Sequence, residues 1–278
     1  MTTTTQTHTI EYVLDGLPQL RLKNHKGDIR VFHDAGPGTV SVRLHSHRPV
    51  SFDDVSSSVD GTTVTIDIPQ LTEADSGTGF TFRIAGISLF AGFRGPTVDA
   101  EVHLPSGADI ALETGYGDIT VSGVSGEAAA KTGAGDVDLP EAGRVTLSSG
   151  AGNVRAGRIS GGTLRTGAGD VSIDSTSSDT DVNSGTGDVT LLDAVGTVRI
   201  NTGAGDVNAS VSEGRIDVRS GMGDIIVRVP VGMPVWQELS TGMGEARSRI
   251  APQGEPEPGE PYLSVTARSG AGDVTLAN

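Results

Sequence analysis

The sequence predicts an all-β protein, a parallel β-solenoid with an irregular all-β cap at its N-terminus. Three observations support this prediction. The hexapeptide TGAGDV occurs unchanged at residues 132–137, 166–171 and 202–207. Near copies bring the motif to nine occurrences, most of them separated by an almost constant step. Between the motifs, apolar and polar residues alternate, which is the pattern of short, half-buried strands.

The first glycines of the nine motifs define the repeat. They lie at positions 115, 133, 150, 167, 185, 203, 221, 242 and 270. The step between them hardly varies as far as Gly221, and only the last two steps, to Gly242 and then to Gly270, are longer. A fixed period over so much of the chain is the signature of a repeat protein, in which each unit contacts its neighbours. We therefore expect residues 106–278 to form a solenoid with nine G-x-G-D corners.

Each repeat contains short strands that need neighbours. In residues 184–200, Val189 and Leu191 alternate with polar residues, and so do Val198 and Ile200 after a glycine break. One such rung buries too little apolar surface to offset its ordering entropy. Rungs stacked about 4.8 Å apart would join these side chains into continuous internal columns. We expect two or three strands per rung and, from the general crossover preference, a right-handed coil.

The S/T-G-x-G-D motif is expected to form the corner between strands. Glycine tolerates positive φ and close backbone approach, so two glycines suit a tight stacked turn. The residue between them varies freely and should face solvent. A serine or threonine precedes the first glycine in all nine copies, where its hydroxyl can bond the turn backbone. The aspartate can accept turn N–H groups as a cap.

The corner aspartates are also candidate calcium ligands. A column of carboxylates about 4.8 Å apart would repel by about 0.9 kcal/mol per neighbouring pair in water, which a cation could relieve. Calcium-binding β-rolls, with two nonapeptides per coil, have a repeat of similar length, but their G-G-x-G-x-D pattern sets the aspartate one place later. A structural corner is therefore favoured, with no cofactor, and calcium is the alternative. The candidates are Asp118, Asp136, Asp170, Asp188, Asp206, Asp224 and Asp273.

The first part of the chain, residues 1–105, lacks the strict period. Strand-like runs continue through it, and NHKGDIRV from Asn24 resembles a degenerate corner. Terminal repeats of solenoids are usually atypical, so we expect an irregular all-β region that caps the first rung. A separate small β-sandwich is the alternative.

A phenylalanine-rich insertion interrupts this region at residues 76–96. It is expected either to fold over the solenoid as a lid or to form an apolar tip for a protein partner or a membrane surface. The candidate interaction residues are Phe80, Phe82, Ile84, Leu89, Phe90 and Phe93.

The C-terminus suggests a second interaction site. Residues 251–261 are rich in proline and glutamate and are expected to form a solvated loop. After the ninth corner only Val274 and Leu276 remain to fill a strand. An unprotected parallel edge invites pairing with another chain, so we expect self-association through this rung unless the loop covers it. A symmetric contact would give dimers and a head-to-tail contact filaments.

Composition excludes several classes of function. The net charge of −15, without a basic stripe, argues against nucleic-acid binding. The chain has no cysteine, no apolar run long enough for a membrane span and no export signal, so a cytoplasmic location is expected. It shows no P-loop, G-x-S-x-G or H-E-x-x-H motif, and we expect no enzyme. A carbohydrate-binding or carbohydrate-cleaving β-helix remains an alternative, although one tryptophan and three tyrosines offer few sugar platforms.

The repeated S/T-G-x-G-D-V/I corners, with VHLPSGADIALETGYGDITV at residues 102–121, resemble a known family. This is the bacterial putative-adhesin family of β-strand-repeat proteins of unknown function. The resemblance covers residues 98–278 most closely. It implies a β-solenoid, a bacterial and more narrowly actinobacterial source, and a link in some members to the cell envelope and its stress responses. We therefore expect a non-enzymatic scaffold or protein-interaction module.

Overall fold

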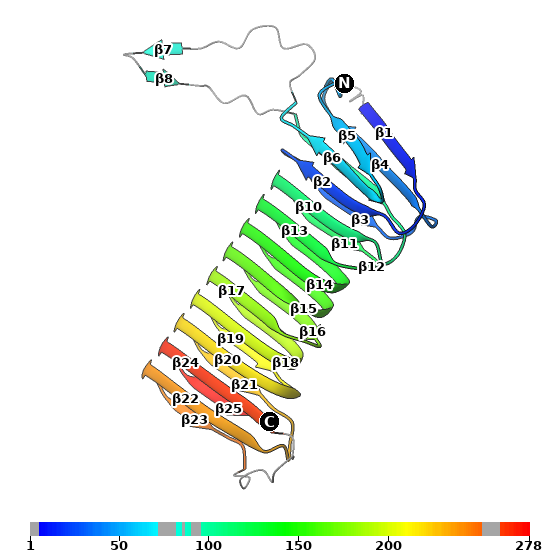
Figure 1. Ribbon diagram of the computed structural model, residues 1–278. Coiled ribbons are helices and arrows are strands. Elements are labelled where there is room, and N and C mark those ends of the chain that lie inside the picture. The colour runs from blue at the N-terminus through cyan, green and yellow to red at the C-terminus, as the bar shows by residue number, and fades with distance from the viewer. Residues whose placement is uncertain (1–5, 72–81, 85–86, 90–95, 252–261) are drawn as a thin grey trace.

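The computed structural model describes residues 6–71, 82–84, 87–89, 96–251 and 262–278. Every regular element in these ranges is a β-strand, which confirms the predicted all-β class. Twenty-three strands belong to one hydrogen-bonded system, and in Figure 1 they stack as the rungs of an elongated body. The described part of the chain has no helix of the length and apolarity that a membrane crossing requires.

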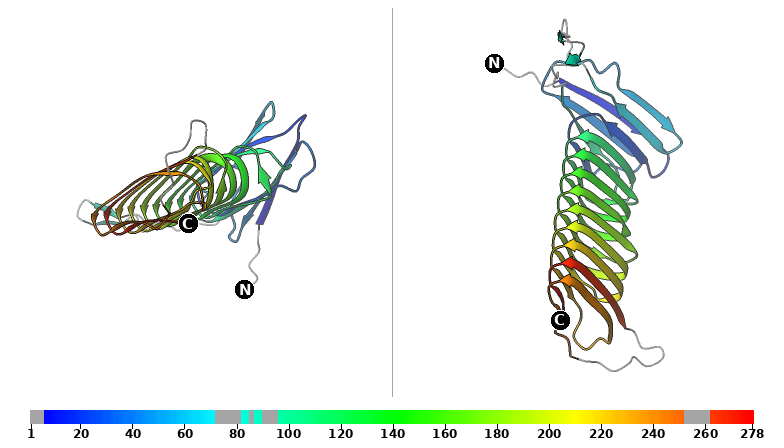
Figure 2. Two further views of the ribbon diagram at one scale, coloured as in Figure 1. Left: turned by 90° about the horizontal axis from the view of Figure 1, so that it is seen from below. Right: turned by 90° about the vertical axis from the view of Figure 1, so that its left-hand side faces the viewer.

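Each rung has two strands, one in each of two facing sheets (Figure 2). In one rung, β10 (Asp109–Tyr116) leads through a corner into β11 (Ile119–Ser122). Neighbouring rungs pair in parallel, and equivalent residues lie side by side, as Leu147 does with Leu164. The stack is therefore β-solenoid-like, as the repeat predicts, and the right-handed coil stays a prediction.

We call the strands before the corners sheet A and those after the corners sheet B. In spatial order, sheet A contains β5 (Ser56–Asp60), β6 (Thr63–Ile68), β2 (Gln19–Asn24), β10, β13 (Ala128–Ala134), the second halves of β14 (Val137–Ala151) and β15 (Val154–Ala168), β17 (Thr180–Thr186), the second half of β18 (Val189–Ala204), β20 (Glu213–Met222), β24 (Leu263–Ala271) and β22 (Val235–Met243).

Sheet B contains β1 (Gln6–Val13), β4 (Thr39–Ser46), β9 (Val98–His103), β3 (Ile29–Phe32), β11, the first halves of β14 and β15, β16 (Val171–Thr176), the first half of β18, β19 (Val207–Ser210), β21 (Ile225–Arg228), β25 (Val274–Ala277) and β23 (Ala246–Ser248). The short strand β12 (Val124–Ser125) lies in a return turn and pairs with β14. The ribbon of β7 (Phe82–Ile84) and β8 (Ile87–Leu89) is separate.

The core consists of the inward-facing side chains of both sheets. Because equivalent residues stack from rung to rung, each inward position becomes a column of aliphatic side chains. One column of sheet A contains Ile66, Leu22, Leu112, Ala130, Leu147, Leu164, Val182, Ile200, Val218 and Ala267, all at most 3% exposed. The alternating pattern thus predicts the core correctly.

The order of rungs in space differs from the order in the chain at both ends. The rung of β2 and β3 lies between the rung of β6 and β9 and the rung of β10 and β11. The rung of β24 and β25 lies between that of β20 and β21 and that of β22 and β23. Figure 1 shows this exchange as a red strand, β24, enclosed by earlier parts of the chain.

The parallel stack also begins earlier than the sequence indicated. We expected it to start at residue 106, whereas β2, β3, β6 and β9 already pair in parallel with it or with each other. These strands continue the two sheets of the solenoid, so β1 to β6 and β9 belong to the same hydrogen-bonded system as the repeats. The boundary was missed because only the degenerate corner near Asn24 marks these rungs.

Candidate functional site

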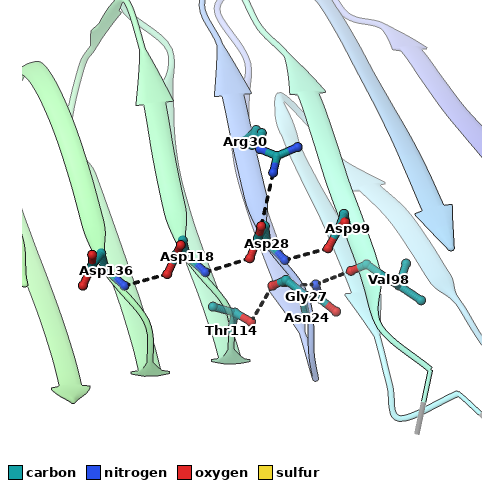
Figure 3. A network of polar contacts seen from close by, with 9 residues as sticks. All are labelled: Asn24, Gly27, Asp28, Arg30, Val98, Asp99, Thr114, Asp118 and Asp136. Atoms are coloured by element: carbon teal, nitrogen blue, oxygen red, sulfur yellow. Dashed lines mark hydrogen bonds and ion pairs between the residues drawn. The ribbon is translucent and has the colours of Figure 1, made fainter. Parts of the chain in front are cut away.

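A ladder of hydrogen bonds joins the corners of successive rungs (Figure 3). Oδ1 of Asp28 accepts the backbone N–H of Asp118 at 3.0 Å, and Oδ1 of Asp118 accepts the N–H of Asp136 at 2.9 Å. The ladder begins at Asp99, which accepts the N–H of Asp28, and repeats at every later corner. The aspartates therefore cap the next rung, where the sequence suggested that each caps its own turn.

The rest of the motif packs backbone against backbone. The hydroxyl of Thr132 is buried and donates to the carbonyl of Gly117 in the neighbouring rung at 2.9 Å. Gly135 has φ of +143°, and a Cβ there would lie 2.2 Å from the same carbonyl oxygen. The residue between the glycines faces outward, and none of the nine is buried. The predicted roles of the glycines and of the variable residue are confirmed.

The seven candidate calcium ligands form a line along the corner edge, exposed or half-buried. Each uses Oδ1 to accept a backbone N–H, so the ladder accounts for their presence without a cation. In the described ranges, no group of three or more histidine, cysteine, aspartate or glutamate side chains could hold a metal ion. Calcium binding stays an alternative prediction.

The placement of Val274 and Leu276 on the open last rung is wrong. Both side chains are 0% exposed, and their strand β25 pairs with β21 on one side and with β23 on the other. After β21 the chain passes over one rung position, forms β22 and β23, and returns to fill the gap. The two long steps between the last corners, from Gly221 to Gly242 and on to Gly270, signal this detour in the sequence.

The last rung of the solenoid is formed by β22 and β23, which we call the open edge. In the described structure, β22 pairs only with β24, and β23 pairs only with β25. Leu263 donates its N–H to the carbonyl of Pro234, so the backbone groups of Pro234 point toward the stack. Because the backbone groups of successive residues point to opposite sides of a strand, every second residue of β22, beginning with Val235, directs its N–H away from the stack. The same reasoning applies to β23, where Val274 donates to Glu245. The N–H groups that point away from the stack belong to Val235, Gln237, Leu239, Ala246 and Ser248.

The inward positions of the open edge are more polar than those of the stack. Gln237 aligns with Val265, and Ser248 aligns with Leu276. Terminal repeats of solenoids carry polar residues for solubility, so this substitution identifies the true end. The aliphatic column nevertheless reaches the edge, because Leu239 is half-buried against the core. These residues were a signal that the sequence reasoning missed.

The opposite end is covered by antiparallel strands. β5 pairs with β6 in sheet A, while β4 pairs with β9 and β1 pairs with β4 in sheet B. The hydroxyl of Tyr12 in β1 donates to Oγ of Ser57 in β5 at 2.9 Å, so the borders of the two sheets meet. Phe52 packs against the core and stacks on His8. The core is therefore closed at this end.

Half of the six candidate residues in the phenylalanine-rich insertion lie outside the described part of the chain. Phe80, Phe90 and Phe93 are outside the described residues. Phe82 and Ile84 belong to β7, and Leu89 belongs to β8 of the separate antiparallel ribbon. Both the lid and the apolar tip stay predictions.

A serine–histidine pair near the third rung was not expected. Nδ1 of His33 lies 2.8 Å from the carbonyl oxygen of Pro105, and Nε2 lies 2.8 Å from Oγ of Ser125. A carbonyl only accepts, so Ser125 donates to Nε2, the polarity used in acyl transfer. Ser125 is 3% exposed, however, and the next N–H, of Gly126, already donates to Ala108. The pair thus fastens a turn and presents no accessible nucleophile.

A second unexpected cluster surrounds His103 on the outer face of sheet B. Its ring nitrogens bond Asp34 at 2.7 Å and Glu101 at 3.2 Å, and its ring stacks on Phe32. Burial lowers the pKa of His103, but the bonds to the two carboxylates outweigh it and raise this pKa above its ordinary value. The hydrogen bond from His103, with Arg43 nearby, lowers the pKa of Glu101 despite burial.

Two shallow grooves lie on the outer face of sheet A, with volumes of about 460 and 250 Å³. They share a floor of short side chains from Ala111, Ala129 and Thr146, beside Arg21. None of their lining residues is aromatic. The grooves therefore lack the ring platforms that sugar binding favours.

The fold and its edge define a repeat protein built as a two-sheet solenoid with one covered and one open end. The chain belongs to the Toastrack DUF4097 family, whose family model matches residues 17–248. This match confirms the resemblance noted from the corners, and one similar solved structure is described as a putative adhesin. No curated protein matches the sequence.

Two similar solved structures come from Parabacteroides distasonis. One, described as a putative adhesin, has 11% identity and a TM-score of 0.54, covering 97% of each chain. The other, described as a putative lipid binding protein, has 12% identity and a TM-score of 0.52, covering 97% of this chain and 96% of that one. A putative adhesin from Bacteroides fragilis has 12% identity and a TM-score of 0.44, covering 98% and 97%. At these identities the likeness shows the fold alone.

Proposed function

We propose that the protein is a non-enzymatic, adhesin-like scaffold that binds another protein through the open edge. The observation that supports this most is the contrast between the two ends of the stack. At one end antiparallel strands cover the core, and their outer strands β1 and β5 are joined by the Tyr12–Ser57 hydrogen bond, while at the other end β22 and β23 leave the core uncovered and keep a free row of backbone groups. Such rows pair readily with another strand, which makes an edge a recognition surface. A link to the cell envelope or its stress response belongs to this proposal.

A pull-down with edge-blocked protein tests the proposal. Proline at Gln237 and Ser248 removes two outward N–H groups without breaking a bond inside the stack. Thr120→Lys is the control, since this side chain lies on the solvent face of β11, away from the open edge. Partners captured from the source organism by the wild type should be identified by mass spectrometry and measured again with purified components.

We expect the double proline variant to lose these partners and the Thr120→Lys variant to keep them. Equal capture by all three proteins would contradict binding at the edge. Binding to a glycan array that survives the proline substitutions would instead support the carbohydrate alternative. The expected cytoplasmic location is part of the proposal, and fractionation of the source cells with an antibody against the chain tests it.

A further inference from the structure

At the open edge, sheets A and B extend equally far along the stack, because β22 is the outermost strand of sheet A and β23 that of sheet B. β22 and β23 are the two halves of one rung, joined by the corner at Thr241 to Glu245, and each has a stack neighbour in the same next rung. The covered end is stepped. Sheet A extends one strand beyond the rung of β6 and β9, namely β5, and sheet B extends two strands, β4 and β1.

This difference determines which contacts can satisfy both strands of the edge. In a head-to-tail contact, β22 and β23 would face a border that is offset by one strand, about 4.8 Å, so both cannot pair at once. In a contact between two open edges related by a two-fold axis, both borders are level. Because a two-fold axis normal to the sheets reverses the strand direction, β22 would pair antiparallel with its copy, and β23 with its own.

The chemistry of the edge also suits a second copy. The charged residues of the last rung and of the segment directly after it are Glu238, Glu245, Arg247 and Arg249, so the charges of this region cancel. The chain as a whole has a net charge of −15. Two such rungs can therefore approach without the repulsion that other parts of this acidic surface would cause. The half-buried ends of the core columns, at Val235 and Leu239, would be covered by the same residues of the other chain.

We propose that the partner at the open edge is a second copy of this chain, joined tail to tail by a two-fold axis into a closed dimer. This inference rests on the proposed function and names its partner. In a closed dimer the open edges of the two chains pair with each other, and the two covered ends lie at the far ends of the dimer. Assembly then stops at two chains, because neither level edge remains free and the outer borders of β1 and β5 at the covered ends are stepped.

Mass measurement over a wide concentration range tests the closed dimer. Light scattering behind size-exclusion chromatography should give about 57 kDa, twice the 28.4 kDa of one chain, with no larger species at higher concentration. The Gln237→Pro/Ser248→Pro variant should weaken dimerisation by at least about tenfold, which corresponds to about 1.4 kcal/mol. Thr120→Lys, on the solvent face of β11, should dimerise like the wild type, and thermal melting should show that all three are folded.

Spin labels can establish the orientation, because the chain has no cysteine of its own. Labels at Ser240→Cys in β22 should give a distance between chains below about 35 Å, since the two edges touch. Labels at Ser58→Cys in β5 should lie roughly 110 Å apart, because about eleven strand spacings of 4.8 Å separate β5 from the contact in each chain. A monomer at every concentration, growth beyond two chains or a short distance at residue 58 would overturn the inference. If the chain is monomeric but the proline variant still loses its partners in the pull-down, the proposed function stands and only the identity of the partner is wrong.

Discussion

The two ends of the solenoid complete the same core in opposite ways. At the N-terminal end the chain reverses direction, and β1, β4 and β5 cover the last parallel rung in antiparallel pairing. At the C-terminal end the chain keeps the parallel arrangement and makes the last rung polar instead. One end is protected by additional strands, and the other only by the composition of its final rung.

The comparison shows that an exposed edge is compatible with a stable stack. Sheet edges are normally blocked because they pair with other chains. Here antiparallel strands cover the core at one end, although their own outer borders, β1 and β5, pair on one side only among the described residues, and no such strands cover the other end. The open edge is therefore a specific feature of this end, and the predictions below test how the two ends differ.

The largest difference is expected at the corner glycines. Gly27 has φ of +136°, and a Cβ there would lie 2.0 Å from the carbonyl of Val98. Its rung is held on both sides, so Gly27→Ala should cost more than about 3 kcal/mol. Gly244 has φ of +134° but belongs to the last rung, which can shift, so Gly244→Ala should cost about 1–2 kcal/mol.

Chemical denaturation measures both variants. Gly61→Ala is the control, because its φ is +59° and no atom lies within 4 Å of the added Cβ. This variant should lose about 1 kcal/mol from backbone strain alone. Equal losses at Gly27 and Gly244 would show that the last rung is as rigid as the covered end.

The core column offers the next largest contrast. Ile66 in β6 and Leu239 in β22 occupy the same inward column, but Ile66 is 1% exposed and Leu239 is only half-buried. Ile66→Ala should cost about 2–5 kcal/mol, whereas Leu239→Ala should cost less than about 1.5 kcal/mol in the monomer. Urea unfolding at low protein concentration checks this, and a large loss at Leu239 would mean that the edge is buried in solution.

The two ends of the aspartate ladder should differ by a smaller amount. Asp99 accepts the N–H of the half-buried Asp28, and Asp273 accepts that of the exposed Glu245. Asp99→Ala should cost about 1 kcal/mol because water replaces its bond poorly, and Asp273→Ala less than about 0.5 kcal/mol. Asparagine at either site should be nearly neutral, since Asn153 fills the same place naturally. A costly asparagine would show that the charge, and not the acceptor, matters.

The pH dependence should be confined to the N-terminal end. The raised pKa of His103 adds stability below its ordinary value of 6.5, and this is lost as pH rises through the folded value. The lowered pKa of Glu101 adds stability above its ordinary value of 4.5, lost as pH falls through the folded value. The melting temperature should therefore fall slightly above pH 6.5 in the wild type. In His103→Gln this slope should disappear, and an unchanged slope would assign it to other groups.

Calcium should have the smallest effect of all. Every candidate aspartate already uses Oδ1 for a backbone N–H, and the ladder needs no cation at either end. Calcium at millimolar concentration should leave the melting temperature unchanged in calorimetry, with magnesium as the control. A calcium-specific increase would support the calcium interpretation, because a ligand that binds the folded state stabilises it.

The sequence predicts those parts of the fold that local chemistry determines. The glycines of each corner and the alternation of Val189 and Leu191 act within one repeat, so they can be recognised before any pairing is known. The order of the rungs is different, because parallel rungs with the same alternation fit one another at many positions in the stack. The order of the last two rungs depends on residues that are far apart in the chain. The apolar Leu276 needs a neighbouring strand on both sides to be buried, whereas the polar Ser248 can lie on the outermost rung.

The sequence predicted that the candidate site is an open parallel edge, but it assigned that edge to the wrong strands. An open parallel edge follows from the repeat, but its location depended on the two long steps near the C-terminus. The bonds of His33 and His103 could not be predicted, because their partners Ser125 and Asp34 lie 92 and 69 residues away in the chain. Such contacts can be inferred only when it is known which rungs are neighbours.

The exchanged order of the final rungs has a consequence for biosynthesis. Strands β22 and β23 leave the ribosome before β24 and β25, yet they can take their final places only with the later pair beneath them. The outermost rung therefore cannot be completed until β24 and β25 have been synthesised and have joined the stack. Until then β22 and β23 lack the strands with which they pair, so the open edge forms only after β24 and β25 are in place.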